Sequence, residues 1–168
     1  MSARRRRDTP HRRSPWPWAI TGAIILAFGL MLTLLSRQPR GPGVGMHWHA
    51  PYTITLCGKP LPPLLPSAGD VHTHGDGIIH IHPGSAASSG RRATLGAAFR
   101  NTQARLTDTG ITIVGGQSYT NGDACPDGQV GTLKVLVQHR TEGRFTLVRN
   151  FLSYVPADRD VIRIIFGP

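Results

Sequence analysis

The 168-residue sequence has few of the residues on which the common enzyme classes depend. It contains nine acidic residues and only two cysteines, Cys57 and Cys125. We find no Ser-His-Asp pattern, no glycine-rich nucleotide-binding loop, no C-x-x-C pair and no paired-carboxylate signature. These absences argue against nucleophilic hydrolysis, nucleotide-dependent chemistry and thiol-disulfide exchange as the activity of this chain.

The shortage of acidic residues gives a formal net charge of +10, but the excess is spread unevenly. Residues 1–40 contain eight arginines and one acid, Asp8, which gives +7; residues 41–168 contain 11 basic and eight acidic residues, which gives +3. A nucleic-acid-binding domain carries its excess charge on the folded part. We therefore expect no nucleic-acid partner and relate the charge to membrane topology.

One long run without any charge covers residues 16–35 (WPWAITGAIILAFGLMLTLL). Twenty helical residues extend roughly 30 Å, enough to cross the hydrocarbon core of a bilayer. More arginines precede the run than follow it, which predicts a cytoplasmic N-terminus. The sequence therefore predicts a single-pass transmembrane anchor in the lipid bilayer of the cell membrane. A cleaved signal peptide is the alternative, although no small-residue cleavage site follows Leu35.

The chain accordingly divides into four predicted parts: a basic cytoplasmic tail (1–15), the anchor (16–35), a Pro/Gly linker (36–45) and an extracytoplasmic domain (46–168). In an oxidising compartment, two cysteines most simply form a disulfide. We therefore predict that Cys57 is bonded to Cys125. The alternative is that Cys57 serves as a thiolate ligand of a metal.

Six of the eight histidines fall into three His-x-His pairs: His47 and His49, His72 and His74, His80 and His82. Alternate residues of a strand point to the same face. A three-residue hairpin loop at 75–77, with a glycine in the left-handed region, would place His72 opposite His80. The second and third pairs then share one face, and the other face carries Val71, Thr73, Ile79 and Ile81. A two-residue turn at 76–77 would split the pairs onto opposite faces.

The first pair begins a run of alternating residues in which Trp48, Tyr52, Ile54 and Leu56 share one face, which is typical of a half-buried strand. Neutral imidazoles suit zinc and copper, and three or four can complete a coordination shell. We therefore predict a copper or zinc site formed by His47, His49, His72, His74, His80 and His82. Asp70 and Asp76 could add a ligand or orient the rings. A solvated hairpin rich in histidine is the alternative.

The remaining sequence predicts an α+β fold in which a small, mostly-β domain with one short helix follows the transmembrane helix. Thr94 is suited to cap a helix that runs to about Gln103. Apolar runs predict strands at 111–114, 132–138 and 161–166, and His139 is expected in a solvated turn. The last strand and the turn before it are similar to those of small β-grasp domains.

These motifs resemble those of uncharacterised bacterial membrane-anchored extracytoplasmic proteins with a segment of the form HTHxxGIIHI. In those proteins a His-x-His strand precedes this segment and a TLGxxF segment follows it. The corresponding segments here are 47–49, 72–81 and 94–99, and the similarity covers most of 46–168. Many such proteins have an acid at the position of His82. No activity is assigned to the group, so the resemblance implies the architecture only.

The sequence thus predicts a membrane-anchored protein that binds a transition metal outside the cytoplasm as a carrier, sensor or accessory factor. Its partner would be a membrane or periplasmic protein. A small metalloenzyme with an open metal position is the alternative, for which Asp70, Asp76 and Cys57 are the candidate bases or nucleophiles. A metal-free structural or interaction module is the third possibility.

Overall fold

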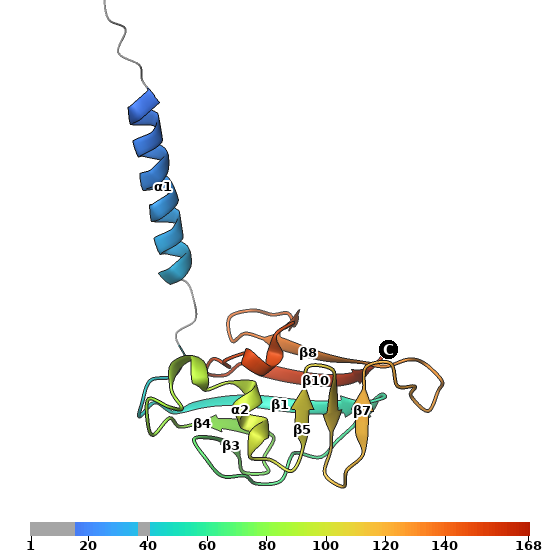
Figure 1. The fold of residues 1–168 in the computed structure, drawn as a ribbon. Coiled ribbons are helices and arrows are strands. Elements are labelled where there is room, and N and C mark those ends of the chain that lie inside the picture. The colour runs from blue at the N-terminus through green and yellow to red at the C-terminus, as the bar shows by residue number, and fades with distance from the viewer. Residues whose placement is uncertain (1–15, 37–40) are drawn as a thin grey trace, which may run out of the picture. The chain divides into compact units, whose positions relative to one another are not determined.

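The computed structural model describes residues 16–36 and 41–168, which belong to two compact units with a boundary after Gln38. The first unit contains one helix, α1 (Trp16–Ser36), and the second contains all the other elements (Figure 1). The predicted basic tail, 1–15, and residues 37–40 of the predicted linker lie outside the described residues.

Helix α1 forms over the long uncharged run, but the prediction that this run crosses a membrane is wrong for the described part of the chain. Among the residues described, no helix has both the length and the hydropathy that a membrane span requires.

The second unit is built around a seven-stranded sheet with the strand order β3-β4-β1-β10-β8-β9, in which β2 also pairs with β1. The strands are β1 (Trp48–Leu56), β2 (Lys59–Pro60), β3 (Val71–Thr73), β4 (Ile78–Ile81), β8 (Thr132–Gln138), β9 (Thr146–Leu147) and β10 (Val161–Gly167). Only β1 and β10 are parallel; the other neighbours are antiparallel. The first and last strands of this unit therefore lie side by side in the middle of the sheet (Figure 1). The β-grasp analogy requires such a pair, but the analogy itself stays a prediction.

Alternation along the strands gives the sheet one apolar face. On β1 the buried residues Tyr52, Ile54 and Leu56 lie opposite the buried Ile162, Ile164 and Phe166 of β10. Helix α2 (Leu95–Arg100) and a three-stranded sheet of β5 (Arg105–Thr107), β6 (Gly110–Thr112) and β7 (Ser118–Thr120) contribute to the same core. The other face of the large sheet carries polar side chains such as Thr53, Arg163 and Lys134, together with the partly buried Leu136 and Ile165.

Much of the predicted secondary structure is present, and the prediction of a small, mostly-β domain with one short α-helix is confirmed. The Thr94 side chain accepts a hydrogen bond from Ala97 N at 3.1 Å, as an N-cap should. Helix α2 ends at Arg100, before the predicted end; the 3₁₀ turn η1 (Gly90–Arg92) precedes it, and a second, η2 (Phe151–Ser153), lies between β9 and β10. Strands β2, β5, β7 and β9 were not predicted.

Part of the predicted linker contacts the second unit. Pro42 is fully buried, and its carbonyl accepts a hydrogen bond from Gly90 N at 2.8 Å. Gly45 N donates to Pro83 O at 2.9 Å. Residues 41–45 therefore lie against the domain, next to the start of β1.

The predicted disulfide is confirmed. Cys57 and Cys125 are bonded, with their Cα atoms 5.5 Å apart and a sequence separation of 68. The bond joins the residue after β1 to the loop that follows β7. Because both sulfurs are used, Cys57 is neither a thiolate ligand nor a nucleophile in this structure.

Candidate metal site

The β3–β4 hairpin has the register that the predicted three-residue loop requires, and its ladder ends with Thr73 opposite Ile79. Gly75 and Gly77 have positive φ angles of 85° and 77°, and Asp76 Oδ1 accepts a hydrogen bond from Ile78 N at 3.0 Å. His72 lies directly opposite His80 in the register. The predicted alternation is therefore confirmed, with the histidines on one face and four buried residues on the other: Val71, Thr73, Ile79 and Ile81.

Strand β1 extends this histidine surface because it runs antiparallel to β4, with His49 opposite His80. His72, His80 and His49 thus form a row across three neighbouring strands. His47 lies two residues before His49, and His82 lies two residues after His80. The ring centroids of His47 and His82 are 3.5 Å apart. Directly opposed side chains on one face of a sheet are close enough to interact, so this register brings imidazoles from separate strands into contact.

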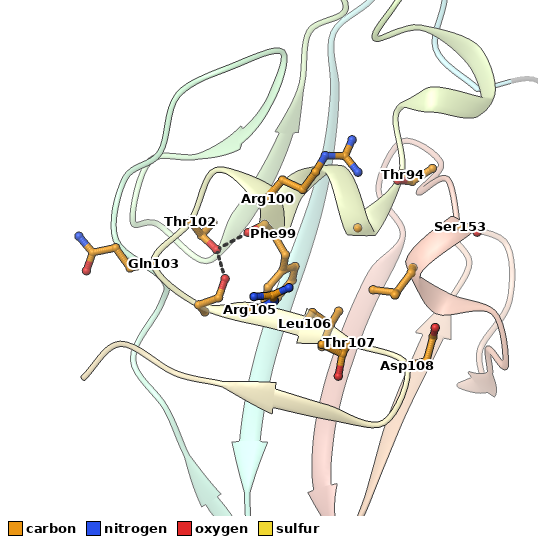
Figure 2. Close-up of a pocket in the computed structure, with 13 residues that line it drawn as sticks. Thr94, Phe99, Arg100, Thr102, Gln103, Arg105, Leu106, Thr107, Asp108 and Ser153 are labelled. Atoms are coloured by element: carbon orange, nitrogen blue, oxygen red, sulfur yellow. Dashed lines mark hydrogen bonds between the residues drawn. The ribbon is translucent and has the colours of Figure 1, made fainter. Parts of the chain in front are cut away.

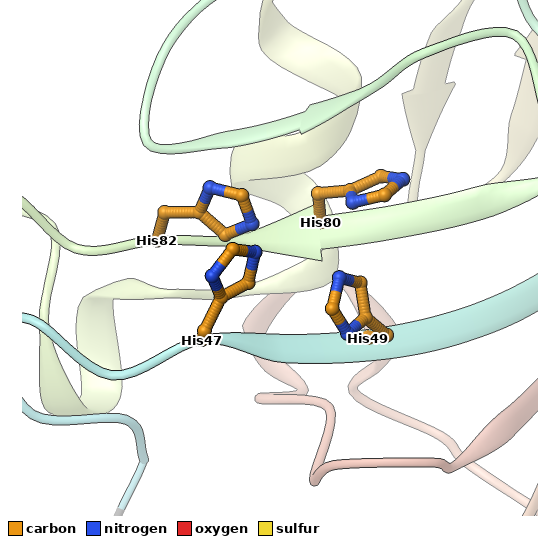
Figure 3. Close-up of side chains that lie close together, drawn as sticks. All are labelled: His47, His49, His80 and His82. Atoms are coloured by element: carbon orange, nitrogen blue, oxygen red, sulfur yellow. The ribbon is translucent and has the colours of Figure 1, made fainter.

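Four of these residues, which we call the four-histidine group, meet in a small volume: His47, His49, His80 and His82 (Figure 3). Each offers one ring nitrogen, and the four nitrogens lie within 4.8 Å of one another. His47 is exposed and the other three are partly buried. The nitrogens of a tetrahedral zinc site are roughly 3.3 Å apart at a Zn–N distance of about 2.05 Å. The group could therefore hold a metal ion after small ring rotations.

Two further contacts suit the four-histidine group to a cation. His80 Nε2 lies 2.8 Å from Asp76 Oδ2, which leaves Nδ1 of this ring as the ligand atom. His82 Nε2 is buried and has no hydrogen-bond partner among the described residues. Buried polar atoms are nearly always paired. An unpaired nitrogen facing the His47 ring (Figure 3) is what a metal ligand would show in the absence of its ion.

The other two predicted ligands lie beside this group and are not part of it. His72 Nε2 and His74 Nε2 are 2.9 Å apart. The His72 ring lies 5.2 Å from that of His82 and 5.6 Å from that of His80, measured between centroids. All six predicted ligands thus form one continuous surface, which we call the histidine face.

The two acids proposed as extra ligands have different surroundings. A hydrogen bond from the Ser88 side chain, and then one from Gly84 N at 2.9 Å, lower the pKa of Asp70. Asp70 therefore anchors the loop after β4. Burial raises the pKa of Asp76, but the hydrogen bonds from His80 and Ile78 outweigh this and lower it overall. Asp76 is thus an ionised carboxylate beside the histidine face.

The sequence analysis missed a loop that holds His49 in place. Asp158 Oδ1 accepts a hydrogen bond from His49 N at 3.1 Å, and Arg159 N donates to His49 O at 2.7 Å. Both bonds fix the backbone of β1 at the point where it presents its histidines. The loop comes from the far end of the sequence, so no local pattern could have revealed this contact.

A buried carboxylate, Asp160, stabilises the same loop. It is 1% exposed and accepts hydrogen bonds from Ala157 N at 2.8 Å and from the Tyr154 hydroxyl. Its Oδ1 lies 3.0 Å from His139 Nδ1. Burial, and then the contact with Asp160, raise the pKa of Tyr154. His139, expected to be an ordinary solvated residue, therefore contacts a buried acid.

The metal-free protein should lose stability as the pH falls from about 6.5 to about 4. Burial, and then the imidazoles of His47, His72, His80 and His49, lower the pKa of His82 from 6.5 to about 4. Below pH 6.5 the unfolded chain takes up a proton that the folded chain does not, so the free energy of unfolding decreases until about pH 4. Thermal unfolding with a chelator present measures this decrease. A His82→Gln variant should show a flatter profile in this window, and an identical profile would contradict the assignment.

A hollow of about 740 Å³ beside α2 and β5 is the other feature with the size of a binding site (Figure 2). Its charged lining residues are Arg100, Arg105 and Asp108. Figure 2 shows the two guanidinium groups well apart from each other. Charged groups therefore do not converge on one point here, and the hollow is a weaker candidate than the histidine face.

Comparison with known proteins adds no assignment to this geometry. The chain matches no protein-family model, no curated protein and no solved structure. The resemblance to membrane-anchored bacterial proteins therefore stays a prediction, and the candidate site is supported by the arrangement of its residues alone.

Proposed function

We propose that the domain binds a transition-metal ion, zinc or copper, through the four-histidine group. The observation that carries this proposal is the placement of four imidazole nitrogens, from the neighbouring strands β1 and β4 and the residues that adjoin them, within 4.8 Å of one another. Four neutral imidazoles form a complete shell for Zn²⁺ or Cu²⁺ without any carboxylate or thiolate. The unpaired Nε2 of His82 supports the same conclusion.

Binding is favoured over catalysis by the state of the groups that a metalloenzyme would need. A hydrolytic site keeps a metal position open and places a base or nucleophile next to it. Cys57 is in a disulfide. Asp70 is hydrogen-bonded to the Ser88 side chain, and Asp76 is hydrogen-bonded to the His80 ring and to Ile78 N. The protein therefore acts as a metal carrier, sensor or accessory factor in this proposal.

The disulfide supports an oxidising compartment as the place where the domain works, because such bonds are rare in the reducing cytosol. A metal carrier there would exchange its ion with a partner protein. The exposed His47 offers the point of access, since the other three rings of the four-histidine group are partly buried.

The full chain, purified without a histidine tag and stripped with a chelator, should retain at least one zinc ion per chain after dialysis against zinc and then against metal-free buffer. Elemental analysis measures the ratio. His11→Gln is the matched control, because it removes a histidine outside residues 41–168 and should retain the ion. A wild-type chain that retains no ion, zinc or copper, would contradict the proposal.

A further inference from the structure

The histidine face extends beyond the four-histidine group to a second pair of imidazoles. His72 Nε2 and His74 Nε2 lie 2.9 Å apart, at the end of β3 next to the hairpin loop. The ring centroid of His74 is 4.4 Å from that of His80. The pair therefore adjoins the first group, and no nitrogen of His74 is needed there.

The separation of these two nitrogens fits a shared ion. Two nitrogens bound to one tetrahedral zinc lie roughly 3.3 Å apart, so 2.9 Å is close to the spacing that coordination requires. Without an ion, one ring must donate its proton to the other. Because His74 is exposed, an ion can reach this pair directly from solvent.

Asp76 supplies the negative charge that such a position needs. It lies in the loop that follows His74, and its Oδ2 is 2.8 Å from His80 Nε2. Its two oxygens keep their hydrogen bonds with His80 and with Ile78 N, and its negative charge acts on the neighbouring pair through space. Two divalent cations held side by side repel each other, and a carboxylate beside both positions offsets that repulsion.

We propose that the histidine face holds two transition-metal ions, the first in the four-histidine group and the second on His72 and His74, with the Asp76 carboxylate beside it. The second position rests on the proposed function, since it shares the face with the first and adjoins the Asp76–His80 contact. Because His74 is exposed, the second position offers a point of entry or transfer in addition to His47.

Equilibrium dialysis of the full, tag-free chain against Zn²⁺, followed by elemental analysis, tests this capacity. The wild-type chain should bind two ions, and His74→Gln should bind one with the affinity of the first site unchanged within about threefold. His11→Gln, which removes a histidine outside residues 41–168, should still bind two. Circular dichroism of each variant verifies that the fold is retained.

The other outcomes separate this inference from the proposed function. One ion in both the wild type and His74→Gln would overturn the second position and leave the first intact. Two ions in His74→Gln would place the second ion elsewhere, and none would indicate a single shared site; either result overturns the inference. No ion in the wild type would contradict the proposed function itself.

Discussion

Replacing His49 and His80 together with glutamine should weaken zinc binding by the four-histidine group more than about 100-fold. These residues oppose each other on β1 and β4, and their ring centroids are 4.8 Å apart. Loss of a hydrogen-bond partner of a ligand can already cost 10- to 100-fold in affinity, so loss of two ligands should cost more. Competition with a chromophoric chelator on the full chain measures the affinity.

The matched control for this double variant is His11→Gln, the same substitution at a histidine outside residues 41–168. Its zinc affinity should equal that of the wild type. Glutamine retains hydrogen-bonding groups at both positions, and both side chains lie on the solvent side of the sheet, so the fold should persist. A double variant with wild-type zinc affinity would show that the ion is held elsewhere.

Removing the disulfide should lower the free energy of unfolding by about 4 kcal/mol, because the bond closes a loop with a sequence separation of 68. Cys57→Ser with Cys125→Ala suits this test, since Cys125 is 5% exposed and alanine places no unpaired polar atom there. For a domain of this size the melting temperature should fall by roughly 10–20 °C. Thermal and denaturant unfolding measure both quantities.

Two controls accompany the disulfide variant. A reductant should destabilise the wild type to the same extent and leave the variant unchanged. The bond follows the end of β1, whose nine residues place it roughly 26 Å from the histidines at the start of the strand. Zinc affinity below the melting temperature should therefore be unaffected. A loss below about 1 kcal/mol would contradict the role assigned to the bond.

The hairpin could be predicted from the sequence because its determinants are local. Two glycines able to adopt positive φ fix the loop length, and the loop length fixes the register that places His72 opposite His80. The disulfide was predictable for a similar reason, since only two cysteines are present. In both cases the sequence allows few alternatives, two turn lengths for the hairpin and a single possible pairing for the cysteines.

The composition of the four-histidine group could not be predicted, because it depends on pairing between distant segments. Twenty-one residues, 57–77, separate β1 from β4, and nothing local specifies that His49 lies opposite His80. All six histidines were expected in one site, whereas the register divides them into four that converge and two beside them.

Weak patterns account for the elements that were missed. Strands β5 and β7 have three residues each, and Leu106 and Tyr119 are their only large apolar side chains. The parallel pairing of β1 with β10, and the loop contacts of Asp158 with His49, join opposite ends of the domain. The predicted membrane-spanning helix is contradicted, because no helix among the described residues has the length and hydropathy of a membrane span.

X-ray absorption spectroscopy at the zinc edge, on the full wild-type chain loaded with one equivalent of zinc, tests the central claim most directly. The account predicts a shell of four nitrogen ligands at about 2.0–2.1 Å with the multiple-scattering signature of imidazole. A shell dominated by oxygen, or one with fewer than three imidazoles, would show that the histidines of β1 and β4 do not converge on the ion.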